Sequence, residues 1–318
     1  MPPSATAAAC FESDPRPTPE VETLPETASL DEILCSLCRV GGCIVKDFVS
    51  ADIIAALAQD FTPLLEAEKG EWSGSFFSAQ SRRVYGCCGK SRVFAEEVVG
   101  HRMWNAVCDA LLSSSHTSFT QYDQVTFTSP PQVCNTTVYS LLPGSEEQAL
   151  HRDDRIHHAH FPKAEKHYVG RDCGVGLFIA GKASTIENGA TRFIPGSHLW
   201  DYSLPPPKDH KPAYAVLEPG DAFLMLSGCY HGASANTSKD SERVLYGTFF
   251  CKSTLRQEEN QYLANDPEVI KHYPDRILRI MGYDISKPFL GWVDMSSPMT
   301  YIRRGDAVSK VYDQNELI

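Results

Sequence analysis

Apolar residues at helical spacing open the part of the sequence that can fold. Ile33, Leu34 and Leu37 follow Asp31 in this spacing, which predicts a short helix capped by Asp31 and ended by the glycine pair 41–42. Ser50 is placed to cap a second helix whose apolar face continues to residue 61, and a third helical pattern covers residues 94–112. Helices are therefore expected to dominate the first third of the chain.

From about residue 125 the pattern changes to short runs of β-branched and aromatic residues, separated by Gly, Pro, Asn and Asp. Evenly spaced short strands of this kind are typical of a barrel or jelly roll. The expected fold is mainly β with flanking α-helices. The predicted strands are residues 43–45, 133–142, 174–180, 191–195, 213–217, 222–226 and 243–251.

Residues 1–28 are rich in Pro, Ala, Thr and Glu and have no apolar period, so they are expected to form a flexible N-terminal arm. Residues 29–318 are then expected to form a single domain, because the 42% hydrophobic content of the chain is enough for one ordinary core.

Composition excludes some partners. The net charge is −11, with 40 acidic against 29 basic residues and no Lys/Arg run, which argues against nucleic acid. No apolar stretch approaches the roughly 18 residues of a membrane span, so no membrane partner is expected. The first residues resemble neither a signal peptide nor a transit peptide, and a cytoplasmic protein is expected.

The 11 cysteines are scattered rather than regularly spaced, which is typical of reduced thiols and predicts no disulfides. Cys35 and Cys38 form a CxxC motif that would suit a metal or redox site. Leu34, Leu37 and Val40 surround them in a helical pattern and no second ligand pair follows, so a structural role is expected instead.

A candidate metal centre lies in the middle of the chain. His151 and Asp153 are two residues apart, and on a strand this spacing directs both side chains to one face, whereas Asp154 would point to the other. His231 is the best third ligand. Two histidines and one carboxylate leave coordination positions free for a co-substrate and dioxygen.

The HxD pair alone is a weak signal, and Arg243 strengthens it. This arginine begins an apolar run downstream of His231, where a buried guanidinium needs an anionic partner. A guanidinium is the natural partner for the far carboxylate of a dicarboxylic acid. A second metal site is an alternative suggested by His157, His158 and His160, but a substrate-facing or solvated loop is expected there instead. No metal-binding role is assigned to His198 either.

Several linked motifs resemble the phytanoyl-CoA dioxygenase-like family of Fe(II)/2-oxoglutarate-dependent oxygenases, particularly its fungal members that tailor alkaloids, polyketides and meroterpenoids. The resemblance implies a double-stranded β-helix (a cupin-like jelly roll), with Fe(II), 2-oxoglutarate and O2. It also implies that Gln148 and Thr191 contact 2-oxoglutarate and that Arg243 forms a salt bridge with it. The motifs are residues 141–144, Gln148 with 151–153, 187–191, 194–198, 218–221, 231–232 with Arg243, and 289–292.

The implied function is a dioxygenase that hydroxylates, desaturates, rearranges or endoperoxidises an apolar polycyclic natural product in a fungal biosynthetic pathway. Halogenation is disfavoured because Asp153 is retained. Homodimerisation is implied by the fungal relatives. Residues expected to line the substrate pocket, from their positions beside the ligands, are Tyr85, Asn135, Thr137, Tyr139, Ile156 and Phe249.

Three alternatives remain. An acyl-CoA hydroxylase of the phytanoyl-CoA type would need a basic patch for the coenzyme A phosphates, and the acidic balance leaves few candidates. A non-catalytic barrel that supports a partner subunit would keep its function without iron. An isomerase using the same iron would turn over without forming succinate. The basic candidates are Lys163, Lys166, Lys182, Lys208 and Lys211.

Overall fold

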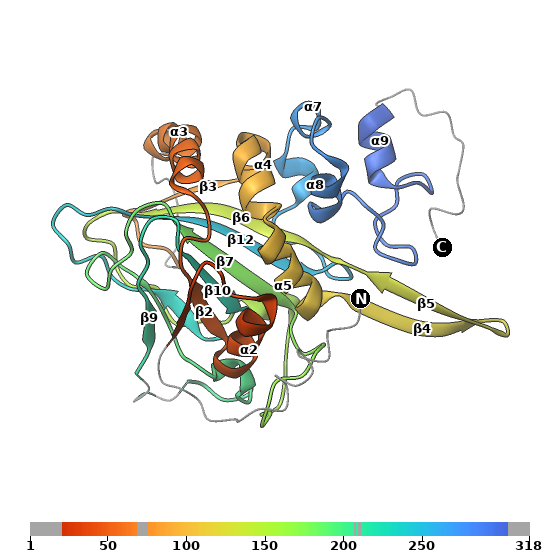
Figure 1. Ribbon diagram of the computed structural model, residues 1–318, viewed down its shortest axis with the longest axis horizontal. Helices are drawn as coiled ribbons and strands as arrows, with labels where there is room; N and C mark the ends of the chain where they lie inside the picture. The colour runs from red at the N-terminus through yellow and green to blue at the C-terminus, as the bar shows by residue number, and fades with distance from the viewer. Residues whose placement is uncertain (1–20, 69–75, 207, 209–210, 305–318) are drawn as a thin grey trace.

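Two facing β-sheets with helices over one outer face form the fold, as seen in the computed structural model, which describes residues 21–68, 76–206, 208 and 211–304 (Figure 1). The larger sheet has seven strands in the order β1-β2-β10-β7-β12-β6-β3. All its neighbours are antiparallel except β1 and β2. Its strands are β1 (Glu22–Leu24), β2 (Gly42–Val45), β3 (Ser81–Tyr85), β6 (Pro131–Leu141), β7 (Gly174–Ala180), β10 (Ala222–Leu226) and β12 (Arg243–Lys252).

The smaller sheet has three strands in the order β11-β8-β9, and a separate hairpin projects from the body of the fold (Figure 1). The two layers confirm the mainly β jelly-roll prediction. β1 lies inside the region expected to be a flexible arm, so the boundary at residue 28 is too late; the rest of that expectation concerns residues outside the described part. The strands are β8 (Thr191–Phe193), β9 (Ala213–Ala215), β11 (His231–Ala233), and β4 (Ser114–Thr120) with β5 (Asp123–Ser129) in the hairpin.

The three predicted helical regions are present with two differences, and α4 and α6 to α9 were not predicted. The first helix is capped by Ser29, whose side chain accepts from the Glu32 N–H, rather than by Asp31. The third pattern is interrupted at Gly100, which separates a π-helix from α5. The helices are α2 (Leu30–Val40), α3 (Ala51–Ala67), α4 (Cys87–Lys90), η1 (Phe94–Val99), α5 (Arg102–Leu112), η2 (Asp153–His157), η3 (Ser197–Leu199), α6 (Gln261–Ala264), α7 (Pro267–Ile270), α8 (Asp275–Ile280) and α9 (Pro298–Arg304).

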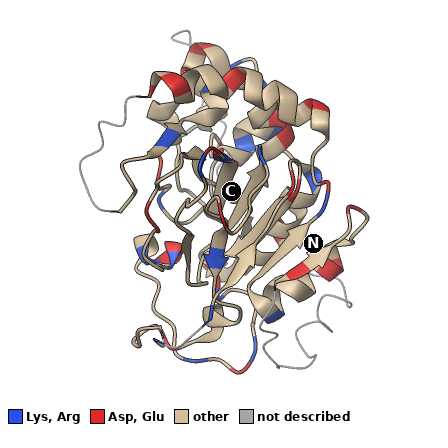
Figure 2. Cartoon of the chain, turned by 90° about the vertical axis from the view of Figure 1, so that its left-hand side faces the viewer, with Lys and Arg blue, Asp and Glu red and all other residues tan. Residues whose placement is uncertain are grey.

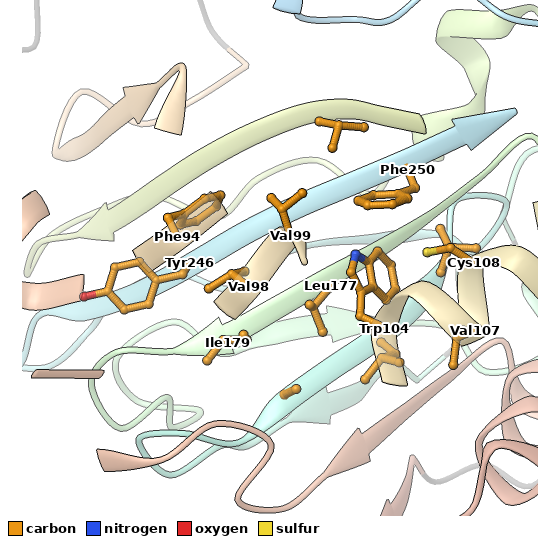
Figure 3. Close-up of a cluster of buried hydrophobic side chains, with 14 of the residues drawn as sticks. Phe94, Val98, Val99, Trp104, Val107, Cys108, Leu177, Ile179, Tyr246 and Phe250 are labelled. Carbon is orange, nitrogen blue, oxygen red and sulfur yellow. The ribbon is translucent and has the colours of Figure 1, made fainter. Parts of the chain in front are cut away.

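The two faces of strand β12 have different roles. Tyr246 and Phe250 point to the helices and join the larger core, where Phe250 packs against Trp104 with ring centroids 5.3 Å apart (Figure 3). Arg243, Leu245 and Phe249 point the other way, into a pocket between the sheets. The period of two along one strand therefore separates core packing from the candidate site.

The structure corrects one expectation about the cysteines. Cys35 is disulfide-bonded, so the prediction of no disulfides is wrong at this position. The other cysteines of the described part are free thiols, and all of them except Cys173 are buried.

Charge and helix length add two observations about the described residues. Lys and Arg are interspersed with Asp and Glu over the described ribbon (Figure 2). None of the described helices combines the length and apolar character needed to cross a bilayer.

Candidate functional site

The pocket brings together the side chains of His151, Asp153 and His231. The distance from His151 Nε2 to Asp153 Oδ1 is 3.3 Å, and that from His231 Nε2 to Asp153 Oδ2 is 3.4 Å. Both imidazoles are buried, with exposed fractions of 8% and 5%, and the three ligand atoms are close enough to hold one metal ion. The structure therefore brings together all three residues that the sequence singled out.

The backbone places the pair His151 and Asp153 differently from the prediction of a regular strand. His151 forms an isolated antiparallel bridge with His231, in which each backbone N–H donates to the other's carbonyl at 2.9 Å. Asp153 instead begins η2, and its N–H donates to the Ser227 carbonyl. The bridge sets the two histidines side by side, and the turn into η2 brings the carboxylate to them.

The hydrogen bonds of the histidines determine which nitrogens are available. The Nδ1 atom of His151 lies 2.9 Å from the Ala149 carbonyl, and that of His231 lies 3.1 Å from the Cys229 carbonyl. A carbonyl only accepts, so each Nδ1 carries the proton and each Nε2 presents a lone pair. Burial lowers the pKa of His231, and the Asp153 carboxylate opposes this only in part, so the neutral form is favoured.

Arg243 lies in the same pocket and has no counter-charge within the described part of the chain. It is 3% exposed, its Nη1 donates to the Gly189 carbonyl at 2.6 Å, and its Nε has no hydrogen-bond partner. No ion pair joins it to an acidic side chain of the described part. Burial lowers the pKa of Arg243 to about 10, so it remains charged near neutral pH.

The sequence model of the phytanoyl-CoA dioxygenase (PhyH) family matches residues 37–244, well over half of the chain. The chain belongs to this family. Dioxygenase himG of Aspergillus japonicus is 38% identical over 285 residues, covering 86% of this chain and 87% of its own. Dioxygenase peniF of Penicillium patulum is 38% identical over 275 residues, covering 86% and 88%.

A solved structure agrees with the jelly-roll fold. The crystal structure of the non-heme alpha ketoglutarate dependent epimerase SnoN from nogalamycin biosynthesis has a TM-score of 0.53 and 18% sequence identity. The superposition covers 70% of this chain and 83% of SnoN. At this identity the likeness concerns the fold alone.

The pocket of this PhyH-family chain has a volume of about 340 Å³ and a lining that combines aromatic and aliphatic side chains with polar and charged ones. Five of the six residues expected in it do line it, namely Tyr85, Asn135, Tyr139, Ile156 and Phe249. Thr137 does not. It is fully buried and donates its hydroxyl to Asn135 Oδ1 at 2.8 Å, because its short side chain ends below the pocket surface formed by its longer neighbours.

Gln148 and Thr191 also line the pocket, on the side of the smaller sheet. Thr191 begins β8 and lies opposite Ala233, whose backbone N–H donates to Gln148 Oε1 at 3.3 Å. Asp154 points away from the histidines, as expected, and accepts from the Tyr202 hydroxyl at 2.7 Å. Burial raises the pKa of Asp154 to about 7.

Some pocket residues were not predicted from the sequence. Leu245 was recognisable, because it follows Arg243 at the strand period of two. Arg155 follows the ligands in η2 and lies over the Phe76 ring at 5.2 Å from its centroid. Glu258 accepts from the Asn135 amide at 3.1 Å, and no local pattern connects this loop residue with the pocket.

Proposed function

We propose that this chain is an Fe(II)- and 2-oxoglutarate-dependent dioxygenase that oxidises an apolar polycyclic natural product in a fungal biosynthetic pathway. The observation that carries the proposal is the combination of a buried His151, Asp153 and His231 cluster with an unpaired buried Arg243 in a single pocket. Either group alone would be compatible with a purely structural role, but together they match a metal and a dianionic co-substrate. The dioxygenase relatives support the same function.

The residues present fit a divalent metal. Two imidazole lone pairs face a carboxylate whose Oδ2 has no hydrogen-bond donor, an arrangement that is repulsive without a cation between them. We assign His151, Asp153 and His231 as the Fe(II) ligands, a set that leaves positions open. When bound, the iron supplies the redox chemistry with dioxygen that couples decarboxylation of 2-oxoglutarate to succinate with oxidation of the substrate.

Arg243 is proposed to hold the far carboxylate of 2-oxoglutarate. Its unpartnered Nε and its fixed charge suit a planar, doubly hydrogen-bonded anion. Gln148 and Thr191 add polar groups to this pocket from the side of the smaller sheet. The role of these residues is to orient the co-substrate and to neutralise its charge.

The remaining wall is proposed to bind the substrate. Tyr139, Phe178 and Phe249 supply apolar rings, with Phe178 and Phe249 in edge contact at 5.3 Å between centroids. Asn135 and Glu258 form a polar patch on this wall that can select for a hydrogen-bond donor on the substrate. The acyl-CoA branch has less support, because Lys182 is paired with Glu242 and Lys163 with Glu165.

We also propose that the enzyme is cytoplasmic and forms homodimers. Nine of the ten cysteines of the described part are free thiols, which supports the first point, whereas the disulfide-bonded Cys35 does not. The second rests on the resemblance to fungal relatives, and the molar mass in solution measured by light scattering tests it.

The experiment that tests the function is anaerobic titration of metal-free protein with Fe(II) and then 2-oxoglutarate. The bidentate chelate gives a weak visible charge-transfer band. We expect the band in the wild type and in Asp154→Asn, a matched control one residue from the ligand. The band should be lost in Asp153→Ala and weakened in Arg243→Ala.

Turnover completes the test. Succinate formation that rises when a fungal metabolite is added would support oxygenation and exclude the isomerase alternative. A correctly folded wild type that gives no band with both components present would overturn the proposal and favour a barrel without catalysis.

A further inference from the structure

A second cluster of metal-binding side chains lies outside the proposed iron site. Cys134 comes from β6, Cys251 from β12 and His157 from the end of η2, and their ligand atoms all lie within 4.8 Å of one another. The Cys134 Sγ and His157 Nε2 atoms are 3.9 Å apart. Two ligands of a tetrahedral zinc ion are roughly 3.6 Å apart, given bond lengths of about 2.3 Å to sulfur and 2.0 Å to nitrogen. The cluster is therefore close to ligand spacing.

Strand geometry accounts for the proximity of the two thiols. β6 and β12 change register at this point, with Phe249 opposite Asn135 and Phe250 opposite Val133, so Cys134 is the extra residue of a β-bulge. A bulge redirects the side chain of the extra residue, and here it sets Cys134 beside Cys251. Both cysteines are almost completely buried, with exposed fractions of 3% and 1%.

The surroundings of Cys134 resemble those of a metal-bound thiolate. The backbone N–H of Glu258 donates to its Sγ at 3.4 Å, and a donor of this kind stabilises the charged form of sulfur. His157 is partly exposed, which leaves a route for an ion to reach the buried sulfurs. The neighbouring His158 and His160 are exposed and are not part of the cluster.

The chemistry of the two clusters differs. The proposed iron site offers two nitrogens and a carboxylate, whereas this cluster offers two sulfurs and a nitrogen. Thiolate ligands favour Zn(II) and Cu(I) over harder ions, and three protein ligands leave a fourth position for water. We propose that Cys134, His157 and Cys251 form a binding site for one thiophilic metal ion, of which Zn(II) is the representative.

The position of the site gives it a consequence for the pocket. His157 ends the same short helix that Asp153 begins, and Cys134 precedes the pocket residue Asn135. A bound ion would fix η2 to β6 and β12 at one end, while Asp153 occupies the other end. The metal site is independent of the proposed function, and only this link to Asp153 rests on it.

Cobalt(II) tests the site directly, because sulfur-to-cobalt charge-transfer bands in the near ultraviolet arise only from cysteine ligands. Reduced, metal-free, full-length protein would be titrated anaerobically with Co(II), and Zn(II) would then be added in competition. We expect a sulfur band that corresponds to about one bound Co(II) ion per chain and is abolished by Zn(II); Co(II) in the proposed iron site adds no sulfur band. Asp153→Ala should retain the band, which separates this site from the proposed iron site.

Matched variants complete the design. Cys134→Ser and Cys251→Ser should lose the band, and His157→Gln should weaken Co(II) binding more than about 100-fold, since loss of a second-shell partner alone costs 10- to 100-fold. Cys108→Ser, a buried cysteine in α5, and the exposed His160→Gln should resemble the wild type.

His157→Gln changes a partly exposed residue and keeps the test valid if a cysteine variant does not fold. Absence of a sulfur band in folded, reduced wild type would overturn the proposal. So would a band that survives in His157→Gln with unchanged affinity.

Discussion

Replacing Arg243 by methionine separates a structural role for this buried arginine from a role in co-substrate binding. A structural arginine stabilises the folded chain, so its removal lowers the free energy of unfolding. An arginine whose role is to bind an anion instead lowers the free energy of unfolding while the anion is absent. We therefore expect Arg243→Met to leave the ligand-free enzyme equally stable or more stable, and to lose affinity for 2-oxoglutarate.

The magnitudes follow from the surroundings of Arg243. Burial lowers its pKa from 12.5 to about 10, and this corresponds to roughly 3 kcal/mol of unfavourable desolvation. The hydrogen bond from its Nη1 to the Gly189 carbonyl offsets roughly 1.5–3 kcal/mol. The variant should therefore be between unchanged and about 2 kcal/mol more stable. For 2-oxoglutarate, loss of one partner of a buried charge pair costs about 2–5 kcal/mol, or roughly 30- to 5,000-fold in Kd.

Two measurements and one control check this prediction. Urea unfolding followed by tryptophan fluorescence gives the stability, and anaerobic titration of the Fe(II)-loaded protein gives the affinity. Arg171→Met is the control, because Arg171 is also buried but donates to the His198 and Pro162 carbonyls, so it should destabilise the fold by about 2–4 kcal/mol. The reasoning is refuted if Arg243→Met is destabilised as much as Arg171→Met while its Kd for 2-oxoglutarate is unchanged.

Three further predictions concern stability. Burial lowers the pKa of His167, but the Asp172 carboxylate outweighs this effect and raises that pKa to about 10. The charged pair therefore stabilises the fold fully below about pH 6.5, and this stabilisation is lost as the pH rises toward 10. At pH 6, Asp172→Asn should lower the free energy of unfolding by about 3–5 kcal/mol. Urea unfolding measured from pH 6 to 10 should then no longer show the loss of stability with rising pH that the wild type shows; an unchanged loss would contradict this prediction. Gly41→Ala should lower Tm by about 5 °C, which corresponds to roughly 3 kcal/mol for a chain of this size, because its Cβ would lie 2.2 Å from Cys229 Sγ at a φ of +89°; a Tm equal to that of the wild type would refute this. Glu259→Ala should cost about 3 kcal/mol, because its carboxylate accepts from the backbone N–H groups of Gly86 and Thr136 and from two side chains; denaturation midpoints within error of the wild type would count against it.

The strands of the central sheet were predictable where burial on both faces gives continuous apolar runs. β7 and β10 have the predicted bounds, 174–180 and 222–226. β3 and the hairpin of β4 and β5 were missed, because β3 and β4 carry mostly polar and charged residues and the apolar alternation in β5 is limited to Val125 and Phe127. Their pairing depends on backbone hydrogen bonds with partners that local sequence does not reveal, such as Ser81 with Leu141.

The site was predictable to the extent that local spacing determines it. Arg243, Leu245 and Phe249 share one face because a strand has a period of two. His151 and Asp153 meet for a different reason, since one lies in a single bridge and the other begins a helix. Thr137 lies on the strand face that points to the pocket, but its side chain is too short to reach it. The cluster of Cys134, His157 and Cys251 depends on a β-bulge that the sequence does not indicate.

Two charged side chains in the pocket each have a buried polar atom without a hydrogen-bond partner. Asp153 Oδ2 lacks a hydrogen-bond donor and Arg243 Nε lacks an acceptor, and folded chains leave few buried polar atoms in this state. The two side chains have opposite charges and line the same pocket, yet they do not form an ion pair with each other. A cation beside Asp153 and an anion beside Arg243 would satisfy both. A dicarboxylate that chelates the cation at one end and reaches Arg243 with the other does this with a single molecule, whereas a monocarboxylate would leave one of the two charges unpaired.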